Sequence, residues 1–245
     1  MNATPRIHLP DAAAGCELEL PPTVAHHLLH VLRLRSGAAL GVFDGAGNEY
    51  DGRLASSGRD TARIAVGELI RHEAEPALAI TLVPAVARAT RMEWMLEKTV
   101  ELGAAEIRPV LTARGKVRLD AERADRRRGH WQAVLASAAA QCGRARLPLL
   151  ASAVPFAEAA REIHAESRIV LLPDAERELA SFPNPGSSLA LFVGPESGFS
   201  AEETQTLLAA GWQAARLGPR TLRTETAGPA ALAAAQALWG DWRTR

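Results

Sequence analysis

Aromatic residues and cysteine are scarce in this chain. Aromatic residues make up 4% of the sequence, so alanine and leucine have to fill most of the core. The two cysteines, Cys16 and Cys142, lie far apart in unlike contexts, which argues against a disulfide framework and against a zinc site. No apolar run is long enough to span a membrane, and residues 1–10, with two prolines, do not resemble a signal peptide. These absences predict a cytoplasmic protein without a metal site.

Net charge is also absent, because 28 basic residues balance 28 acidic ones. A phosphate-binding surface therefore requires a local excess of charge. Residues 108–146 carry such an excess, with ten basic and three acidic side chains. Because the arginine guanidinium matches phosphate geometry, we expect this segment to contact phosphates; for Arg126–Arg128 an ordinary solvated helix face is the alternative. Arg114 and Lys116 belong to the same segment.

The stretch 189–228 says most about function. Leu189–Val193 is apolar and predicts a buried strand, which runs into Gly194-Pro195-Glu196-Ser197-Gly198, a loop of small residues that lets a ligand approach the backbone. Ser200 and Glu203 have the spacing of a capping box, which predicts a helix directly after the loop.

A second short strand, 214–217, runs into another glycine-containing loop at 218–226. Loops that follow neighbouring strands of an open α/β sheet can face each other across one crevice, where such sheets bind ligands. We therefore expect a ligand site between the two loops.

The rest of the chain divides near residue 72. Residues 1–72 predict a compact β-rich unit, and a polar connector follows at 71–77. From residue 78 onward strands alternate with helices, which predicts an α/β fold with a mostly parallel sheet. Expected strands are 41–43, 50–54, 61–66, 78–83, 106–110 and 168–172, and expected helices are 121–140 and 156–164.

Two further helices have distinctive patterns. Thr90 and Glu93 predict a capping box at the start of the first, and its apolar stripe predicts core residues at Met92, Met95, Leu96, Thr99 and Val100. The second, 227–239, is apolar on every side, so it is either central in the fold or packs against a second subunit.

Separated blocks of sequence carry a resemblance to a known family. GPESG at 194–198 precedes LGPRTLRTETA at 217–227; earlier blocks are HHLLHVLRLRSG, FDGAGNEY, RMEWMLEKTVELGAAEIRPV and QCGRARLP. In this order they resemble the SPOUT-class RNA methyltransferases, specifically the bacterial family that methylates N3 of one uridine in 16S ribosomal RNA. That family's loop usually has glycine where this chain has Ser197.

The resemblance implies the architecture, the cofactor and the partners. Residues 1–72 are expected to form a PUA-like β-barrel that binds RNA, and residues 73–245 a SPOUT methyltransferase domain with a trefoil knot at about 190–240. The implied methyl donor is S-adenosyl-L-methionine. The implied partners are 16S rRNA in the small ribosomal subunit and a second copy of the chain in a homodimer.

The resemblance also implies site residues. The cofactor pocket is expected to contain Leu172, Val193, Gly194, Pro195, Glu196, Gly198, Leu217, Gly218, Leu222, Arg223, Thr224 and Ala227. Substrate RNA is expected to contact Arg6, Arg33, Arg35, Arg114, Lys116, Arg126, Arg127, Arg128 and Arg220. For Arg33 and Arg35, an exposed charged helix end is the alternative.

Methylation of uracil N3 requires that its proton leave. Glu196 and Glu225 are the candidate general bases, and the alternative for each is to cap a helix or to pair with Arg220 or Arg223. Arg144, Arg220 and Arg223 can instead stabilise the uracil oxyanion electrostatically.

Two other classes of function are alternatives for this chain. The sequence has neither G-x-G-x-x-G between a strand and a helix nor a Walker-type loop, which disfavours a dinucleotide-dependent oxidoreductase. An RNA-binding module without chemistry is the second alternative.

Overall fold

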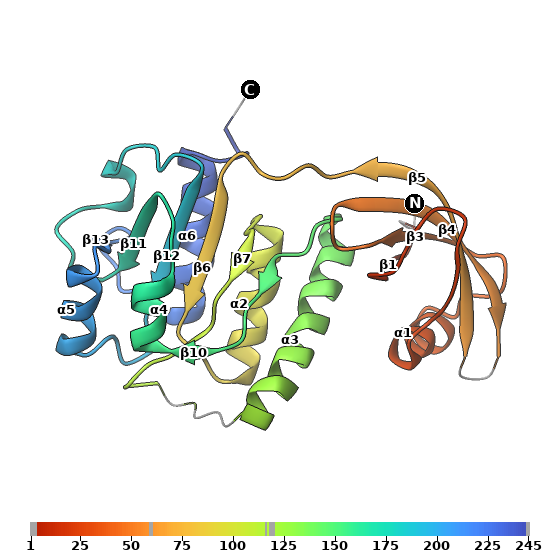
Figure 1. Ribbon diagram of the computed structural model, residues 1–245, viewed down its shortest axis with the longest axis horizontal. Coiled ribbons are helices and arrows are strands. Elements are labelled where there is room, and N and C mark those ends of the chain that lie inside the picture. Colours follow the sequence, from red (N-terminus) through yellow and green to blue (C-terminus); the bar gives the residue numbers. More distant parts are fainter. Residues whose placement is uncertain (1–3, 59–60, 116, 118–120, 244–245) are drawn as a thin grey trace. The chain divides into compact units, whose positions relative to one another are not determined.

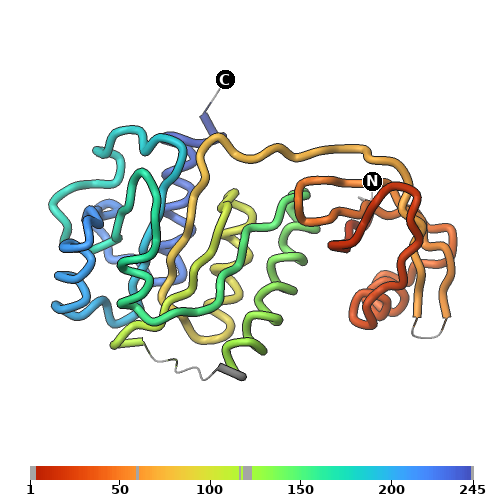
Figure 2. The backbone as a smooth tube through the Cα atoms, in the orientation of Figure 1, coloured from red at the N-terminus to blue at the C-terminus, as the bar shows by residue number. Residues whose placement is uncertain are grey.

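The computed structural model of the protein describes residues 4–58, 61–115, 117 and 121–243 (Figures 1 and 2). Two compact units divide the chain. The first contains Met1–Glu75 and Ala136–Leu147, and the second contains Pro76–Leu135 and Pro148–Arg245. Helix α3 (Ala121–Cys142) therefore contributes to both units.

The first unit is built on a five-stranded sheet in the order β1-β3-β4-β5-β2. The strands are β1 (Arg6–His8), β2 (Glu17–Glu19), β3 (Ala39–Phe43), β4 (Asn48–Ser57) and β5 (Ala62–His72). Apolar side chains alternate along β4 and β5, so Leu54, Ile64 and Val66 lie buried on one face. Three of these strands were predicted with shorter bounds. Strands β1 and β2 were not predicted, because three residues are too few to show a period-2 pattern.

A short helical segment closes one side of this core. Helix α1 (Pro22–His26) continues as a π-helical turn, η1 (His27–Val31), and Ala25 and Leu28 are buried. Arg33 follows with a positive φ of 55°, and its side chain is exposed.

The second unit contains a six-stranded sheet in the order β13-β11-β12-β6-β7-β9, in which every pair is parallel. Its strands are β6 (Ala79–Pro84), β7 (Glu106–Ile107), β9 (Leu149–Leu150), β11 (Ser167–Leu171), β12 (Ser188–Val193) and β13 (Gln213–Ala215). Strands β8 (Val110–Leu111) and β10 (Val154–Pro155) form a separate parallel pair. The mostly parallel α/β sheet is confirmed.

One expectation about this sheet was wrong. Strands β12 and β13, which follow each other in the functional stretch, are not neighbours, because β11 lies between them. A chain that leaves β12, passes through α5 (Ala201–Ala209) and adds a parallel strand has to cross over, and here it crosses β11. Their loops still end at one edge of the sheet, since parallel strands share a direction.

Helices cover both faces of the parallel sheet (Figure 1). Helix α6 (Thr224–Leu238) contacts β6, β12 and α2 (Ala89–Glu101), while α4 (Phe156–Glu162) contacts α5. Phe192 and Trp212 pack edge to face in the core under α4 and α5, with ring centroids 5.1 Å apart.

Helix α2 tests two predictions. Its buried residues are the predicted stripe of Met92, Met95, Leu96, Thr99 and Val100. The Thr90–Glu93 capping box was wrong, because the helix begins at Ala89 with Arg88 as the N-cap residue and without a side-chain cap bond. The helix thus starts earlier than the Thr90–Glu93 spacing implied.

Helix α6 is buried on one face only. Gly228 packs closely there: a Cβ at this position would lie 3.3 Å from Leu82 and 3.4 Å from the sulfur of Met95. On the other face Thr226 and Ala237 are exposed and Ala233 is half-buried. The helix therefore packs on the fold by one face, and its apolar outer face stays partly open to solvent.

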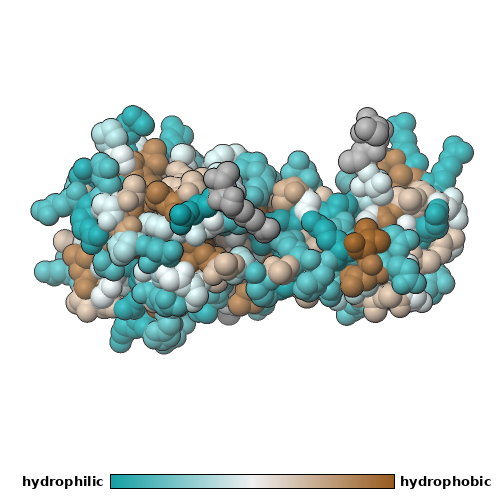
Figure 3. Space-filling view, turned by 90° about the horizontal axis from the view of Figure 1, so that it is seen from above, coloured by the Kyte–Doolittle hydropathy of each residue, from teal (hydrophilic) through white to brown (hydrophobic). Residues whose placement is uncertain are grey.

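Hydrophobic side chains on the face drawn in Figure 3 lie in small groups among hydrophilic ones. Exposed large hydrophobic residues include Leu69, Ile70, Trp94 and Trp242. In the described part of the chain, no helix combines the length and apolar character that crossing a membrane requires.

Candidate functional site

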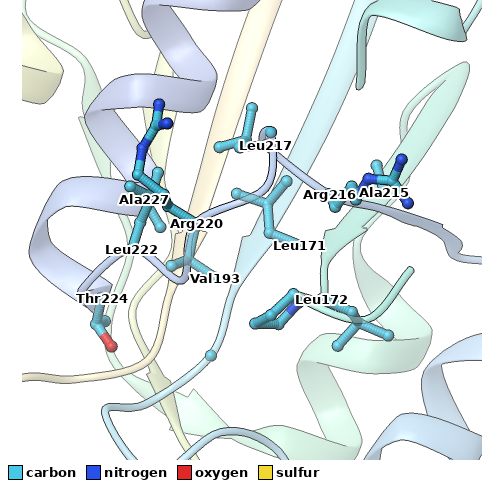
Figure 4. Close-up of a pocket in the computed structure, with 13 residues that line it drawn as sticks. Leu171, Leu172, Val193, Ala215, Arg216, Leu217, Arg220, Leu222, Thr224 and Ala227 are labelled. Carbon is cyan, nitrogen blue, oxygen red and sulfur yellow. The ribbon is translucent and has the colours of Figure 1, made fainter. Parts of the chain in front are cut away.

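A cavity lies at the carboxyl ends of β11, β12 and β13, and we call it the larger cavity (Figure 4). Its volume is about 490 Å³, including open space at its mouth. It is lined by Leu171, Leu172, Pro173, Val193, Gly194, Ala215, Arg216, Leu217, Gly218, Arg220, Leu222, Thr224 and Ala227. The loops after β12 and β13 therefore border one crevice, as predicted.

Apolar side chains predominate among the residues that line the larger cavity, but almost half of its exposed lining is polar. Among the backbone hydrogen bonds of the described residues, none is donated by the N–H of Gly194, Leu217 or Leu222. The charged end of Arg216 is occupied, because its Nη1 donates to the carbonyls of Ala175 and Glu176 at 3.0 and 3.1 Å. The cavity thus offers apolar surface and free N–H groups, which suit a neutral heterocycle.

A second space, the smaller cavity, opens at the carboxyl ends of β6 and β12, and its volume is about 290 Å³ including open solvent. It is lined by Ala85, Val86, Ala87, Arg88, Arg114, Val117, Pro195, Glu196, Ser197 and Thr224. The loop after β12 separates the two spaces: Gly194 lines the larger cavity and Pro195 the smaller one. Thr224 lines both.

The dividing loop is fixed by close contacts. A Cβ on Gly194 would lie 2.9 Å from the ring of Phe199, so only glycine fits there. The N–H of Gly198, which has a φ of 69°, donates to the carbonyl of Pro195 at 2.8 Å and closes a tight turn. Ser197 Oγ donates to the carbonyl of Arg114 at 3.0 Å, so its hydroxyl ties the loop to a neighbouring segment.

The predicted capping box after this loop is confirmed. Ser200 Oγ accepts from the N–H of Glu203 at 3.1 Å, and Glu203 Oε2 accepts from the N–H of Ser200 at 2.9 Å. Glu203 Oε1 also accepts from the N–H of Ala113 at 2.7 Å. The start of α5 is thereby held against the segment that carries Arg114.

An ion-pair cluster joins α2 to the loop after β12 and to the first turn of α6. Arg91, on α2, pairs with Glu196, and its Nε lies 3.6 Å from Glu225 Oε1. If these glutamates formed ion pairs, Arg220 or Arg223 was the expected partner. The structure pairs both glutamates with Arg91 instead. Glu225 Oε2 is buried and, within the described residues, has no hydrogen-bond partner.

The structure distributes the predicted cofactor residues over the two cavities. The larger cavity gathers Leu172, Val193, Gly194, Leu217, Gly218, Leu222, Thr224 and Ala227, together with Arg220, which was expected to contact RNA. Pro195 and Glu196 line the smaller cavity. Gly198 and Arg223 line neither of the two; Arg223 is the N-cap residue of α6.

Most of the arginines that were predicted to contact RNA have exposed side chains. Arg33, Arg35, Arg114, Arg126 and Arg128 are exposed, and Arg127 is half-buried. Lys116 lies outside the described residues.

Two other arginines that were predicted as site residues, Arg6 and Arg144, belong to the first unit and bind partners within that unit. Arg6 donates to Glu49 at 2.7 Å and to the carbonyls of Ala139 and Ala140. Arg144 pairs with Glu73 at 3.4 Å. A contact of Arg6 with RNA and a catalytic role of Arg144 stay predictions.

Sequence reasoning missed Arg88 and Arg91. Both residues follow β6, whose carboxyl end lies at the same edge of the sheet as those of β11, β12 and β13. Their position directly after a predicted parallel strand could have indicated that they lie near the site. No group of three or more His, Cys, Asp or Glu side chains in the described ranges could hold a metal ion.

Two family models match the chain. Residues 74–236 match the RNA methyltransferase domain, and residues 20–66 match the RNA methyltransferase PUA domain. With the parallel sheet and its cavities, these matches define the class of the protein: an RNA methyltransferase with an N-terminal PUA-like domain.

Curated relatives and solved structures narrow this class. The chain is 33% identical to ribosomal RNA small subunit methyltransferase E of Mycobacterium bovis, over 88% of this chain and 84% of the relative. The chain belongs to the ribosomal RNA small subunit methyltransferase E family.

Two similar solved structures contain S-adenosylmethionine. The Neisseria gonorrhoeae enzyme of this family is 34% identical, with a TM-score of 0.88 over 98% of this chain and 100% of the other. A putative methyltransferase from Legionella pneumophila is 33% identical, with a TM-score of 0.93 over 97% and 99% of the two chains.

Proposed function

We propose that this protein methylates N3 of one specific uridine in 16S rRNA, acts on the small ribosomal subunit, and uses S-adenosylmethionine as the methyl donor. The observation that carries the proposal is the larger cavity, which the loops after β12 and β13 border together at the carboxyl edge of the parallel sheet. The names of the relatives support the ribosomal substrate. A ribosomal RNA substrate implies a cytoplasmic protein.

The residues of the larger cavity fit this donor. The apolar side chains of Leu171, Leu217 and Leu222 suit the adenine faces, and the unpaired N–H groups around them suit ring nitrogens. When bound, the donor supplies a methyl group on a positively charged sulfur. The protein supplies position, which is worth roughly 7–11 kcal/mol for well-oriented reactants.

The proton on uracil N3 needs an acceptor or a stabilised anion. Glu196 and Glu225 remain the candidate general bases, and such help contributes about 10²–10⁴-fold in rate. Arg144, Arg220 and Arg223 are the candidates for stabilising the oxyanion.

For RNA binding we propose two surfaces. Residues 1–72 act as the PUA-like RNA-binding domain through Arg33 and Arg35, which are exposed. In the methyltransferase domain, residues 73–245, the arginines of the segment 108–128 contact phosphates.

We further propose a homodimer. The outer face of α6 supports it, because Ala233 is only half-buried there and Trp94 and Trp242 are 42% and 54% exposed. Light scattering on the purified protein tests this proposal, and a monomer at micromolar concentration contradicts it.

A trefoil knot within residues 190–240 is part of the same proposal. Its support is the contact between the segment after β13 and the connection from β11 to β12: Arg216 bonds to Ala175 and Glu176, and α6 contacts η2 (Leu179–Ser181). A crystallographic trace in which residues 216–223 pass beside that connection rather than through it contradicts the knot.

The decisive experiment maps methylated uridine by mass spectrometry in 16S rRNA from cells that lack the protein. The expected result is loss of one N3-methyluridine, restored by the wild-type gene. Ala227→Phe, which fills the larger cavity, should not restore it. Ala209→Phe, on the exposed side of α5, is the matched control and should. An unchanged methylation pattern in the deletion strain contradicts the proposal.

A further inference from the structure

The smaller cavity is the feature that the proposed function leaves without an occupant. It shares Thr224 with the larger cavity, and Gly194 and Pro195, adjacent in sequence, line one cavity each. In-line methyl transfer needs donor and acceptor in contact. A cavity that touches the donor site through a shared wall is therefore placed to hold the acceptor.

The lining of the smaller cavity differs in chemistry from that of the larger one. Two cations, Arg88 and Arg114, are exposed at its rim, where guanidinium groups suit phosphate oxygens. Small apolar side chains, Ala85 and Ala87, form a buried wall against which a flat ring can lie. One carboxylate, Glu196, completes the lining.

We infer that the smaller cavity receives the target uracil ring, turned out of the RNA, and that Glu196 accepts the proton of its N3. The inference rests on the proposed function and deepens it. Enzymes that modify a base act on single strands or turn the nucleotide out into a pocket. Uracil offers an N3–H donor that a carboxylate can accept, whereas cytosine presents a lone pair at N3, which a carboxylate repels.

Glu196 is preferred over Glu225 on position. Both pair with Arg91, but Glu196 lines the smaller cavity and Glu225 does not. Arg91 is then a positioning residue: its guanidinium holds the Glu196 carboxylate at the cavity wall from α2. Arg88 and Arg114 bind the phosphates on either side of the turned-out nucleotide.

The step balances without any other reactant. The N3–H bond breaks and its proton moves to a Glu196 oxygen, while the N3 electron pair forms the bond to the methyl carbon. The carbon–sulfur bond breaks with its electron pair on sulfur, which becomes a neutral thioether. Glu196 then returns the proton to water.

Occupancy of the cavity is tested by photocrosslinking, which needs no methyl donor. An RNA fragment with 4-thiouridine at the target position is bound to the full-length protein, irradiated, digested and mapped. Crosslinks within residues 85–88 or 194–197 are expected. Crosslinks confined to other peptides overturn the placement.

The role of Glu196 is tested by Glu196→Gln, which keeps an acceptor oxygen but loses the negative charge. Turnover should fall about 100–1,000-fold in a single-turnover assay, within the range of a lost general base. Crosslink yield and affinity for S-adenosylmethionine should change less than about threefold. Turnover of the variant should rise about tenfold per pH unit, because only RNA that is already deprotonated reacts.

Glu225→Gln is the matched comparison, since it removes the same kind of contact with Arg91. Its turnover should fall about tenfold at most, with the pH dependence of the wild type. An equal or larger loss in Glu225→Gln overturns the assignment of Glu196. If instead the wild-type protein itself transfers no methyl group to uridine N3, the proposed function fails, and the two failures are distinct.

Discussion

Two clusters of arginine and glutamate, one in each unit, differ in how fully their buried polar atoms are satisfied among the described residues. In the first unit one carboxylate, Glu49, lies between two arginines: Arg6 donates to it at 2.7 Å and Arg71 at 3.0 Å. The remaining donors of Arg6 reach the carbonyls of Ala139, Ala140 and Arg144. They thereby tie the Arg6 side chain to the last turn of α3 and to the residue Arg144 beyond it. We call this set the Glu49 cluster.

In the second unit one arginine, Arg91, lies between two carboxylates, Glu196 and Glu225. We call this set the Arg91 cluster. It has acceptors to spare, because Glu225 Oε2 is buried and unpartnered among the described residues. Clusters whose donors all have acceptors stabilise a fold, whereas spare buried acceptors cost stability and are found where a ligand or a reaction uses them. We therefore expect the Glu49 cluster to contribute stability, and the Arg91 cluster to contribute to the proposed reaction through Glu196.

The largest expected effect is loss of stability in Arg6→Ala. The side chains of Arg6 and Glu49 are 14% and 10% exposed, so breaking their pair should lower the free energy of unfolding by about 3 kcal/mol. Urea unfolding measures this change. Turnover at low temperature should stay within about twofold of the wild type. A stable variant with weakened RNA binding would instead support Arg6 as an RNA contact.

Arg91→Ala should show the reverse pattern. Turnover should fall about 30-fold, or about 2 kcal/mol, because Glu196 loses its orientation. The free energy of unfolding should change by about 1 kcal/mol or less, since the Arg91 side chain is 40% exposed. Arg91→Lys should recover only part of the rate, because a single ammonium does not reproduce the guanidinium fork. Equal turnover in all three proteins contradicts the chemical role of this cluster.

The pH dependence of stability separates the clusters further. Burial alone would raise the pKa of Glu49, but hydrogen bonds and charge from Arg6 and Arg71 together outweigh it and hold the pKa below its ordinary value. Its stabilisation is therefore complete above the pKa of the unfolded chain, and it is lost as pH falls through the lower folded-state pKa. Glu49→Gln should be less stable than the wild type at pH 7 by about 1–2 kcal/mol, and acidification should shrink that difference. Urea titrations at several pH values measure it, and a constant difference contradicts the ion-pair explanation.

The smallest effect is expected at Arg126–Arg128, of which Arg126 and Arg128 are exposed and Arg127 is half-buried. Replacing all three with alanine should weaken RNA binding and reduce the slope of log affinity against log salt by about 0.7 per lost phosphate contact. Part of the Arg128 guanidinium is already engaged, because its Nε donates to the carbonyl of Leu150 at 3.3 Å. Arg161→Ala, at an exposed position on α4, is the control. An unchanged salt slope makes Arg126–Arg128 a solvated helix face.

Local patterns in the sequence predicted local structure well. The Ser200–Glu203 capping box and the buried stripe of α2 were both predicted from spacing and are confirmed. Such features depend on residues within one or two helical turns, so their spacing contains the necessary information. Both loops of the larger cavity were predicted for the same reason.

Long-range contacts could not be predicted in this way. Arg91 pairs with a glutamate 105 positions later, and no local spacing encodes that distance. Thr90 and Glu93 have the spacing of a capping box, but the prediction was wrong because the helix starts at Ala89. The Glu93 carboxylate pairs with His130 instead. The position of β11 between β12 and β13 likewise follows from how the chain crosses the sheet, which periodicity does not report.

Thr224 is the first residue of α6 and lines both cavities. A ligand in one cavity therefore contacts a residue that a ligand in the other cavity also contacts. If the two cavities hold the methyl donor and the RNA, thermodynamic linkage requires that the donor change the affinity for RNA by the same factor as RNA changes the affinity for the donor. The enzyme is expected to sense, through one threonine, whether both reactants are present.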